Sequence, residues 1–177
     1  CMGYVMSKKR DHIILTLDTG HFHPTEVVSA KLGAIFAFSD SLLLHVSRPV
    51  RWDSDHVVAI DDETKTIMEE LVRLGKLQDT YIATDFFDAS INRIAAWIIG
   101  LRNTRKAMLA ALLQPVDLMK KAEADGDVTA RLAMAQEFRA SAFSLVWDYY
   151  CAEKNAGVGL DWLKDVKGYE ASVLATR

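Results

Sequence analysis

Three segments of the chain repeat one pattern, in which a short apolar run ends at a polar side chain and residues with helical periodicity follow. The runs have the length of strands, and the segments behind them carry apolar residues three or four positions apart. Continuously apolar strands that are each followed by a helix predict a parallel sheet covered on both faces, and hence an α/β fold. The expected strands are 13–17, 42–44 and 81–84, which stop at Asp18, His45 and Asp85.

Helices are expected behind each of these strands. Pro24 suits the first position of the first helix, because proline lacks the N–H that has no helical partner there. The acidic run 61–63 suits the N-terminus of the second helix, and the third is expected over about 91–113. The apolar face of the first helix is expected to hold Val28, Leu32 and Ile35.

The pattern of strands ends at Pro115. Two helical segments, 116–124 and 128–140, are separated by an Asp-Gly-Asp turn, and an aromatic tail with a turn at 155–159 is expected to be helical as well. We therefore divide the chain into βα units over 1–114 and a C-terminal helical extension over 115–177.

Three strands do not close a sheet, since two edges keep unpaired N–H and C=O groups. The start of the chain, Cys1 to Tyr4, also resembles the interior of a longer sequence. We therefore expect three βα units from the C-terminal portion of a TIM-type (β/α)8 barrel, whose earlier strands are not in this chain. The alternative is an intact small α/β domain whose edge is covered by a partner.

Composition narrows the class of protein. The chain has 177 residues, 50% of them hydrophobic and 25% charged, which excludes a disordered chain. The net charge of -3 and the lack of a basic stripe make nucleic acid an unexpected partner. The longest apolar run, 95–100, is too short to span a membrane. Two distant cysteines and the lack of an export signal favour a cytoplasmic setting.

Residues that can bind metal fall where the strands end. The carboxyl ends of parallel strands face one way, so these side chains are expected to lie close together. Carboxylates and imidazoles without thiolates favour Mn, Mg, Co or a non-structural Zn site, and four aspartates at one mouth would repel each other without a cation. One or two divalent ions are therefore expected. The candidates are Asp18, His45 and Asp85, with His21, His23, Asp53 and Asp55 just beyond the strands.

Each candidate also has a structural interpretation. Asp18 could cap the following helix, and His23 is a natural neighbour of a helix N-cap. Asp53 and Asp55 could form an Asx-turn pair that shapes a loop. His45 could be a core histidine with satisfied hydrogen bonds. The joint pattern is stronger than its parts, because three strands end in ligand residues at the functional edge of the sheet.

Two aromatic residues follow the third strand. Because Phe86 and Phe87 stand between Asp85 and Asp88, one of these carboxylates is expected to be buried among aromatic rings. Asp88 together with Ser90 is expected to cap the long helix that follows.

Around these residues the sequence closely resembles the bacterial L-rhamnose isomerase family. The resemblance rests on three contiguous strings: HFHPTE at 21–26, LHVSRPVRWDSDHVV at 44–58 and DFFDASINR at 85–93. It continues through the long helix and, more loosely, along the tail to Trp162 and Tyr169. The family's barrel is more than twice this length, so the chain resembles its C-terminal part.

The resemblance implies a function. Members of the family are metal-dependent aldose–ketose isomerases that interconvert L-rhamnose and L-rhamnulose in rhamnose catabolism, typically with Mn2+ and as homotetramers, and Co2+, Mg2+ or Zn2+ can substitute. The resemblance places the catalytic ion on His21, Asp53 and Asp55. It places a structural ion on Asp18, His45 and Asp85, together with a glutamate from an earlier strand.

The chemistry of the sugar is compatible with two routes. A cation can hold and polarise the oxygens on C1 and C2, while a carboxylate such as Asp85 moves the hydroxyl proton and hydride shifts between the carbons. Enolisation would instead need a carboxylate placed as a general base near C2.

Two other functions stay open on the residues alone. A metal-dependent hydrolase or endonuclease could use a similar barrel, although its site would normally sit in a basic surface. A truncated, non-catalytic fragment could also keep the ligands without a complete site.

Overall fold

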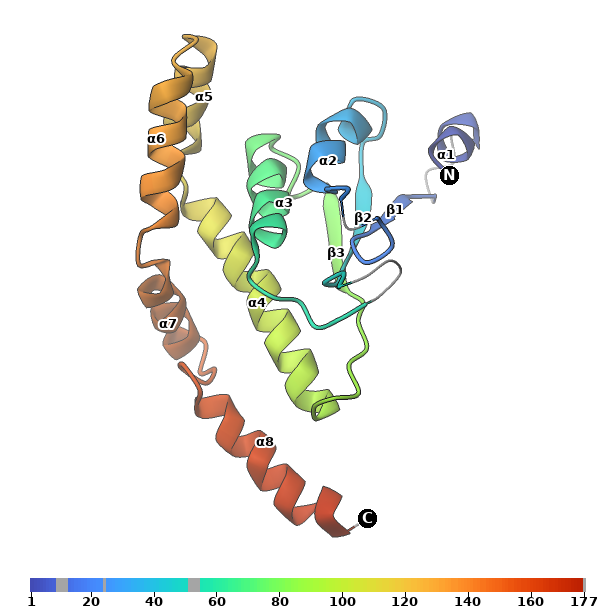
Figure 1. Cartoon of the computed structure of the whole chain (residues 1–177), viewed down its shortest axis with the longest axis vertical. Coiled ribbons are helices and arrows are strands. Elements are labelled where there is room, and N and C mark those ends of the chain that lie inside the picture. The colour runs from blue at the N-terminus through green and yellow to red at the C-terminus, as the bar shows by residue number, and fades with distance from the viewer. Residues whose placement is uncertain (9–12, 24, 51–54, 177) are drawn as a thin grey trace.

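A computed structural model describes residues 1–8, 13–23, 25–50 and 55–176 of the chain. Its centre is a three-stranded parallel sheet in the order β1-β2-β3, with helices beside it (Figure 1). The elements in chain order are α1 (Met2–Lys8), β1 (Leu15–Asp18), α2 (Ser29–Phe36), β2 (Leu42–Val46), α3 (Asp62–Arg73), β3 (Thr80–Thr84), α4 (Arg93–Leu113), α5 (Val116–Ala124), α6 (Val128–Arg139), α7 (Phe143–Glu153), α8 (Asp161–Ser172) and the 3-10 helix Leu174–Thr176.

The three predicted strands and their parallel pairing are confirmed. The register places Asp18 of β1 beside His45 of β2, and His45 beside Ala83 of β3. Asp85 comes directly after β3, where its N–H donates to the carbonyl oxygen of Val46 at 3.1 Å. The strand ends therefore carry the predicted side chains to one edge of the sheet.

The prediction that helices cover both faces of the sheet is wrong for the described residues. On β1 and β2, the alternate side chains Leu15, Leu17, Leu42, Leu44 and Val46 are buried in one core. That core contains Val28 just before α2, Leu32 and Ile35 of α2, Ile67, Met68 and Leu71 of α3, and Ala107 and Ala111 of α4. On the opposite face Thr16 is exposed and Tyr81 is 60% exposed. Right-handed crossovers between strands in sequential order place all the connecting helices on one face.

The predicted helices are present, with one shifted start. Asp61 caps α3 as the acidic run predicted, because its side chain accepts from the N–H of Thr64 at 2.8 Å. In contrast, α2 begins at Ser29 rather than near Pro24, which lies outside the described residues. Glu63 of α3 accepts from both the N–H and the hydroxyl of Ser29, each at 2.9 Å. A carboxylate from a neighbouring helix thus accepts the hydrogen bond of the N–H at the start of α2. The local sequence does not predict this contact.

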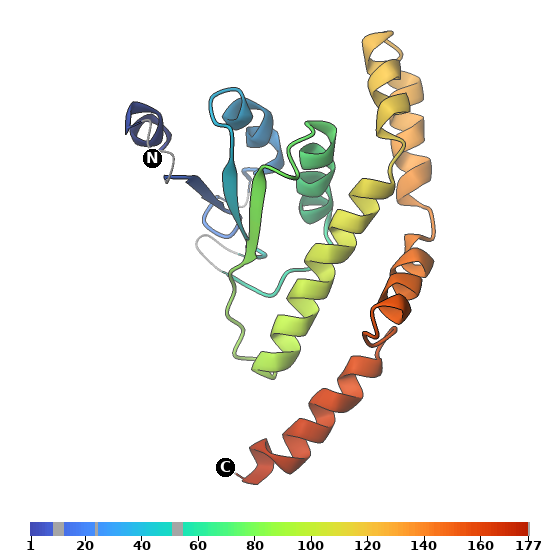
Figure 2. The same cartoon turned by 180° about the vertical axis from the view of Figure 1, so that it is seen from behind.

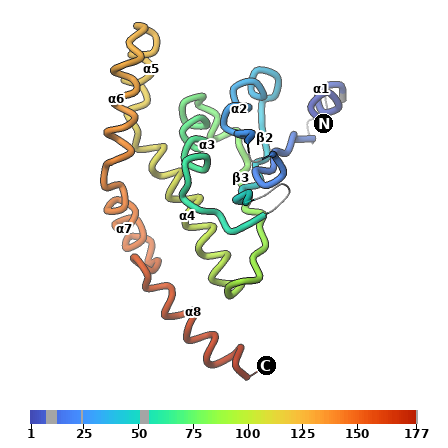
Figure 3. The backbone as a smooth tube through the Cα atoms, in the orientation of Figure 1, coloured from blue at the N-terminus to red at the C-terminus, as the bar shows by residue number. Residues whose placement is uncertain are grey.

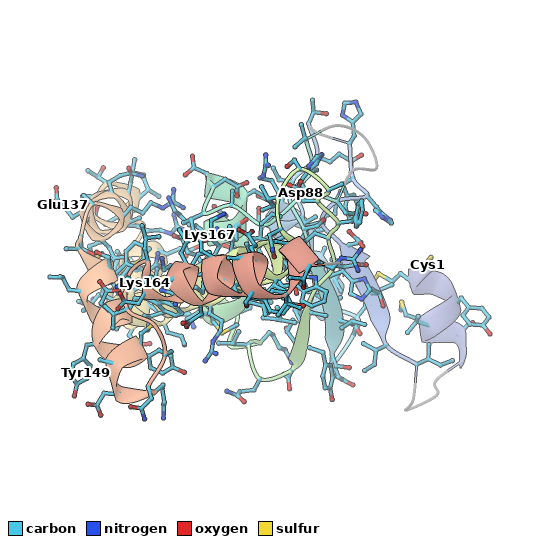
Figure 4. The ribbon with its side chains drawn as sticks, turned by 90° about the horizontal axis from the view of Figure 1, so that it is seen from below. Cys1, Asp88, Glu137, Tyr149, Lys164 and Lys167 are labelled. Carbon is cyan, nitrogen blue, oxygen red and sulfur yellow. The ribbon has the colours of Figure 1, made fainter. Side chains whose placement is uncertain are left out.

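The C-terminal helices extend along the outer side of α4, away from the sheet (Figures 1 and 2). α7 and α8 contact α4, and α5 pairs with α6 across the Asp-Gly-Asp turn, where Gly126 has a φ of 75°. The two ends of the chain lie apart, at α1 beside β1 and beyond α8 (Figure 3). Seen from below, Cys1 and Glu137 lie on opposite sides of the molecule, and α8 carries Lys164 and Lys167 between them (Figure 4).

In the part of the chain that the structure describes, no helix has both the length and the apolar character needed to cross a membrane.

Candidate metal centre

The first group of possible metal ligands forms where the three strands end. Asp18 and His45 are register partners, and Oδ2 of Asp18 lies 3.5 Å from Nδ1 of His45. Oδ2 of Asp85 approaches the same Nδ1 at 3.3 Å. One ligand atom from each of these side chains lies within 4.8 Å of the others. The structure therefore brings together the three residues that end the predicted strands.

The second group forms just beyond β1. Nε2 of His21 lies 3.4 Å from Oδ2 of Asp55 and 3.9 Å from Oδ2 of Asp18. These three residues also place one ligand atom each within 4.8 Å of the others. Asp18 thus belongs to both groups, and its side chain is only 13% exposed.

The donor sets fit a hard or borderline divalent cation. Each group supplies two carboxylates and one imidazole and no thiolate, which suits Mn2+, Mg2+, Co2+ or a non-structural Zn2+. Within the described ranges, the ion pairs of Asp18, Asp55 and Asp85 are made with His21 and His45 rather than with lysine or arginine. A cation would relieve the repulsion among three neighbouring carboxylates.

The backbone fixes the ligand residues from several sides. The N–H of Gly20 donates to Oδ1 of Asp18 at 2.9 Å, which leaves Oδ2 facing the histidines. The N–H of Phe87 donates to the carbonyl oxygen of Asp55 at 3.0 Å. The loop after β2 is therefore attached to the segment that follows β3.

Three residues around the site were not predicted to have a role. Thr19 and Ser47 are buried, and hydrogen bonds between them join the segments that follow β1 and β2. The Ser47 hydroxyl donates to Oδ1 of Asp55 at 3.0 Å. Gly20 leaves no room for a side chain, because a Cβ atom there would overlap Asp55 and Ser47. The only sequence feature that could have indicated these roles is the position of a glycine and two small hydroxyl residues next to the strand ends.

Some of the predicted candidates have other surroundings. Asp53 lies outside the described residues. His23 belongs to neither ligand group, and its Nδ1 lies 2.6 Å from the Thr25 hydroxyl. The prediction that a carboxylate is buried between the aromatic residues is wrong, because Asp85 is exposed and Asp88 is half-buried.

The prediction that Asp88, together with Ser90, caps the long helix is wrong. The side chain of Asn92 caps α4 by accepting from the N–H groups of Ile94 and Ala95. Asp88 instead accepts from both the N–H and the hydroxyl of Ser90. These bonds lower the pKa of the Asp88 carboxyl, and His56 and Arg48 add smaller effects in the same direction.

The structure is thus an α/β protein with a carboxylate–imidazole cluster that could hold a metal ion at the carboxyl edge of its parallel sheet. The family model for L-rhamnose isomerase (RhaA) matches residues 1–177. The chain therefore belongs to the L-rhamnose isomerase family, and the resemblance noted in the sequence is confirmed.

Two relatives give the extent of this similarity. The chain is 52% identical over 176 residues to the L-rhamnose isomerase of Escherichia coli (strain SMS-3-5 / SECEC). It is 53% identical over 176 residues to the L-rhamnose isomerase of Listeria monocytogenes serotype 4a (strain HCC23). Both comparisons cover 99% of this chain and 41% of the relative. The chain thus spans less than half the length of these relatives.

Proposed function

We propose that the chain supplies the metal-binding part of an aldose–ketose isomerase that interconverts L-rhamnose and L-rhamnulose. The observation that carries this proposal is the pair of ligand groups sharing Asp18 at the carboxyl edge of the sheet, in a chain of this family. The isomerisation needs two neighbouring sugar oxygens to be held at once, and two adjacent cation sites suit that task.

In this proposal the two groups have different tasks. His21 and Asp55, with Asp53, hold the catalytic ion, and Asp18, His45 and Asp85 hold the second ion. We propose Mn2+ as the ion, since the oxygen and nitrogen donors suit it. When bound, the cation supplies the Lewis acidity that polarises the oxygens on C1 and C2 of the open-chain sugar.

Asp85 is proposed to move the hydroxyl proton of the substrate. Its side chain is 60% exposed and extends from the end of β3, so a sugar above this edge can reach it. Oδ2 faces His45, and Oδ1 is proposed to accept the proton from one hydroxyl and return it to the neighbouring oxygen. The hydrogen on carbon moves between C2 and C1 in the same conversion.

The open face of the sheet supports a larger architecture. Sequential parallel strands with α2, α3 and α4 on one side are the arrangement of consecutive units in a (β/α)8 barrel, whose interior faces the other side. We propose that residues 1–114 form the last units of such a barrel and that 115–177 form a helical extension. On family membership we also propose a cytoplasmic homotetramer.

The test compares ligand variants of the complete protein. We expect His21→Ala and Asp55→Asn each to lower kcat/KM for L-rhamnose at least about 100-fold, since Lewis acidity contributes several kcal/mol to the rate. Circular dichroism should show an unchanged fold, because neither side chain belongs to the core. His23→Ala is the matched control, since it removes a neighbouring imidazole outside both groups. Turnover like that of the wild type in His21→Ala would overturn the proposal.

A further inference from the structure

We propose that Ser47 is a positioning residue for the ion held by His21 and Asp55, which acts by fixing the orientation of the Asp55 carboxylate. This inference rests on the proposed function, because it assumes that the group binds a cation. Ser47 is not itself one of the ligands in either group.

The first observation is the division of the two Asp55 oxygens. The Ser47 hydroxyl donates to Oδ1 at 3.0 Å, while Oδ2 lies 3.4 Å from Nε2 of His21. One oxygen is therefore bound to the protein, and the other is directed to the ligand group. Holding a carboxylate in this way favours binding through one oxygen and removes the cost of orienting it when the ion arrives.

The second observation is that Thr19 fixes Ser47 in turn. The Thr19 hydroxyl donates to the carbonyl oxygen of Ser47 at 2.7 Å and accepts from the N–H of Ser47 at 2.8 Å. The N–H of Thr19 donates to the carbonyl oxygen of His45 at 3.0 Å. The side chain of Thr19 thus continues the β1–β2 ladder beyond the paired ligands Asp18 and His45.

The burial of this pair strengthens the argument. Thr19 is 5% exposed and Ser47 is 3% exposed, so water competes little for their hydrogen bonds. A buried hydroxyl without a partner is costly, which holds both side chains in the observed arrangement. The position of Ser47 is therefore set by the buried hydroxyl of Thr19 next to the strand ends.

The third observation is the space that Gly20 leaves. A Cβ atom at this position would overlap both Oδ1 of Asp55 and Oγ of Ser47. The hydrogen bond between Ser47 and Asp55 therefore exists only because residue 20 has no side chain. Gly20 and Ser47 thus both lie directly against Oδ1 of Asp55.

Another serine of the chain offers a matched comparison. Ser29 is 5% exposed and donates its hydroxyl to a carboxylate, that of Glu63, at 2.9 Å. This bond joins α2 to α3, and neither Ser29 nor Glu63 belongs to a ligand group. Removal of either hydroxyl should lower stability to a similar extent, but only Ser47 should affect the binding of the ion.

The experiment measures Mn2+ binding to the complete protein after removal of metal with a chelator. Calorimetric titration and the Mn2+ electron paramagnetic resonance signal give the affinity of each site. We expect Ser47→Ala to weaken one of two sites about 10- to 100-fold and to leave the other within about twofold. Ser29→Ala should leave both affinities unchanged while lowering the melting temperature.

A second pair of variants keeps the test decisive if Ser47→Ala fails to fold. Thr19→Val removes the hydroxyl that holds Ser47 and should weaken the same site, whereas Thr19→Ser keeps the hydroxyl and should restore its affinity. Equal affinities in wild type, Ser47→Ala and Thr19→Val would overturn the role of Ser47. Failure of the wild type to bind Mn2+ at all would instead overturn the proposed function.

Discussion

Asp18 has a special position among the residues of the site, because its Oδ2 faces both His45 and His21. A carboxylate shared by two ligand groups places the groups side by side at one edge of the sheet. The bond from the Gly20 N–H to Oδ1 holds the other oxygen of this carboxylate. Asp18 is therefore the residue that the two groups have in common.

Part of this centre could be predicted from the sequence alone. Asp18, His45 and Asp85 were found because strands of a parallel sheet bring their carboxyl ends together, which is a property of the fold class. The role of Ser47 could not be found in this way. Its partner Thr19 lies 28 positions away, and only the strand register shows that the two residues meet.

Substitution of Gly20 tests the close approach at the site. The Cβ atom of Gly20→Ala would overlap Oδ1 of Asp55, so the carboxylate that faces His21 must shift. We expect a loss of about 1–3 kcal/mol in the free energy of unfolding, as for other overpacked positions. Mn2+ affinity should fall at least about tenfold, as for other residues that orient a ligand. Chemical denaturation and metal titration measure the two effects.

Gly33 supplies the control for this substitution. It lies in α2, and a Cβ atom there would meet nothing within 4 Å. Gly33→Ala should raise the free energy of unfolding by about 0.5–1 kcal/mol, because alanine loses less conformational entropy in a helix. Equal effects of the two substitutions would show that Asp55 does not pack against Gly20.

The carboxyl of Asp88 provides a pH test at the residue scale. Hydrogen bonds from Ser90 lower its pKa, so the folded state favours the carboxylate form. The associated stabilisation is present above about pH 4, the ordinary range of aspartate, and is lost as the pH falls through the lowered pKa. Ser90→Ala should raise the pKa of Asp88 toward its ordinary value. Carbon-detected NMR titration of the carboxyl measures both values.

The control for this titration is Ser39→Ala, since the Ser39 hydroxyl donates to the carbonyl oxygen of Ser41 and not to a carboxylate. The pKa of Asp88 should not change in that variant. An Asp88 carboxyl that titrates at the same pH with and without the Ser90 hydroxyl would contradict the prediction.

At the scale of elements, helix boundaries set by local sequence were predicted well, and those set by tertiary contacts were not. α5 begins at Val116 and ends at Ala124, as its pattern predicted, because Pro115 and the Asp-Gly-Asp turn are local signals. α2 begins at Ser29 because Glu63 of α3 satisfies its first N–H. That contact spans 34 positions, so no local pattern could reveal it.

Arg102 of α4 holds the C-terminal helices to the rest of the molecule. Its guanidinium donates to the carbonyl oxygens of Gly157 at 2.9 Å and Gly159 at 3.2 Å. It also lies 5.3 Å from the centroid of the buried Trp147 ring of α7. One planar group thus joins α4 to α7 and to the turn before α8.

Substitution of this arginine should loosen the C-terminal helices. Arg102→Lys keeps the charge but cannot reach two carbonyl oxygens with one planar group. We expect a loss of about 1–2 kcal/mol in stability, with faster amide hydrogen exchange in α7 and the 155–159 turn. Hydrogen-exchange mass spectrometry measures the effect. Arg73→Lys is the control, since its partner Glu70 lies in the same helix and exchange in α7 should not change.

At the scale of the whole molecule, the α/β class and the three parallel strands followed from the sequence, whereas the open face of the sheet did not. Leucine runs such as Leu42, Leu43 and Leu44 suggested burial on both sides. In the structure Leu42 and Leu44 are fully buried, but Leu43 is only half-buried on the opposite face. Apolar residues on both faces indicate that a second layer belongs there, without showing whether this chain supplies it.

The exposed sheet face and its two edges predict how the 177-residue chain behaves by itself. Within the described ranges, β1 and β3 each pair only with β2, so their outer edges keep unpaired backbone groups. Tyr81 is 60% exposed and Thr16 is exposed on the uncovered face. We expect the isolated chain to associate, to bind a hydrophobic dye and to melt over a broad range of temperature.

Co-expression with the remaining part of an L-rhamnose isomerase should give one sharp transition. That transition should shift upward with Mn2+, because an ion bound only by the folded state stabilises it by mass action. Calorimetry and dye fluorescence measure these effects, with magnesium-free buffer and added chelator as the control. A monomeric 177-residue chain with a sharp, metal-responsive melt and no dye binding would show that the uncovered face needs no second layer.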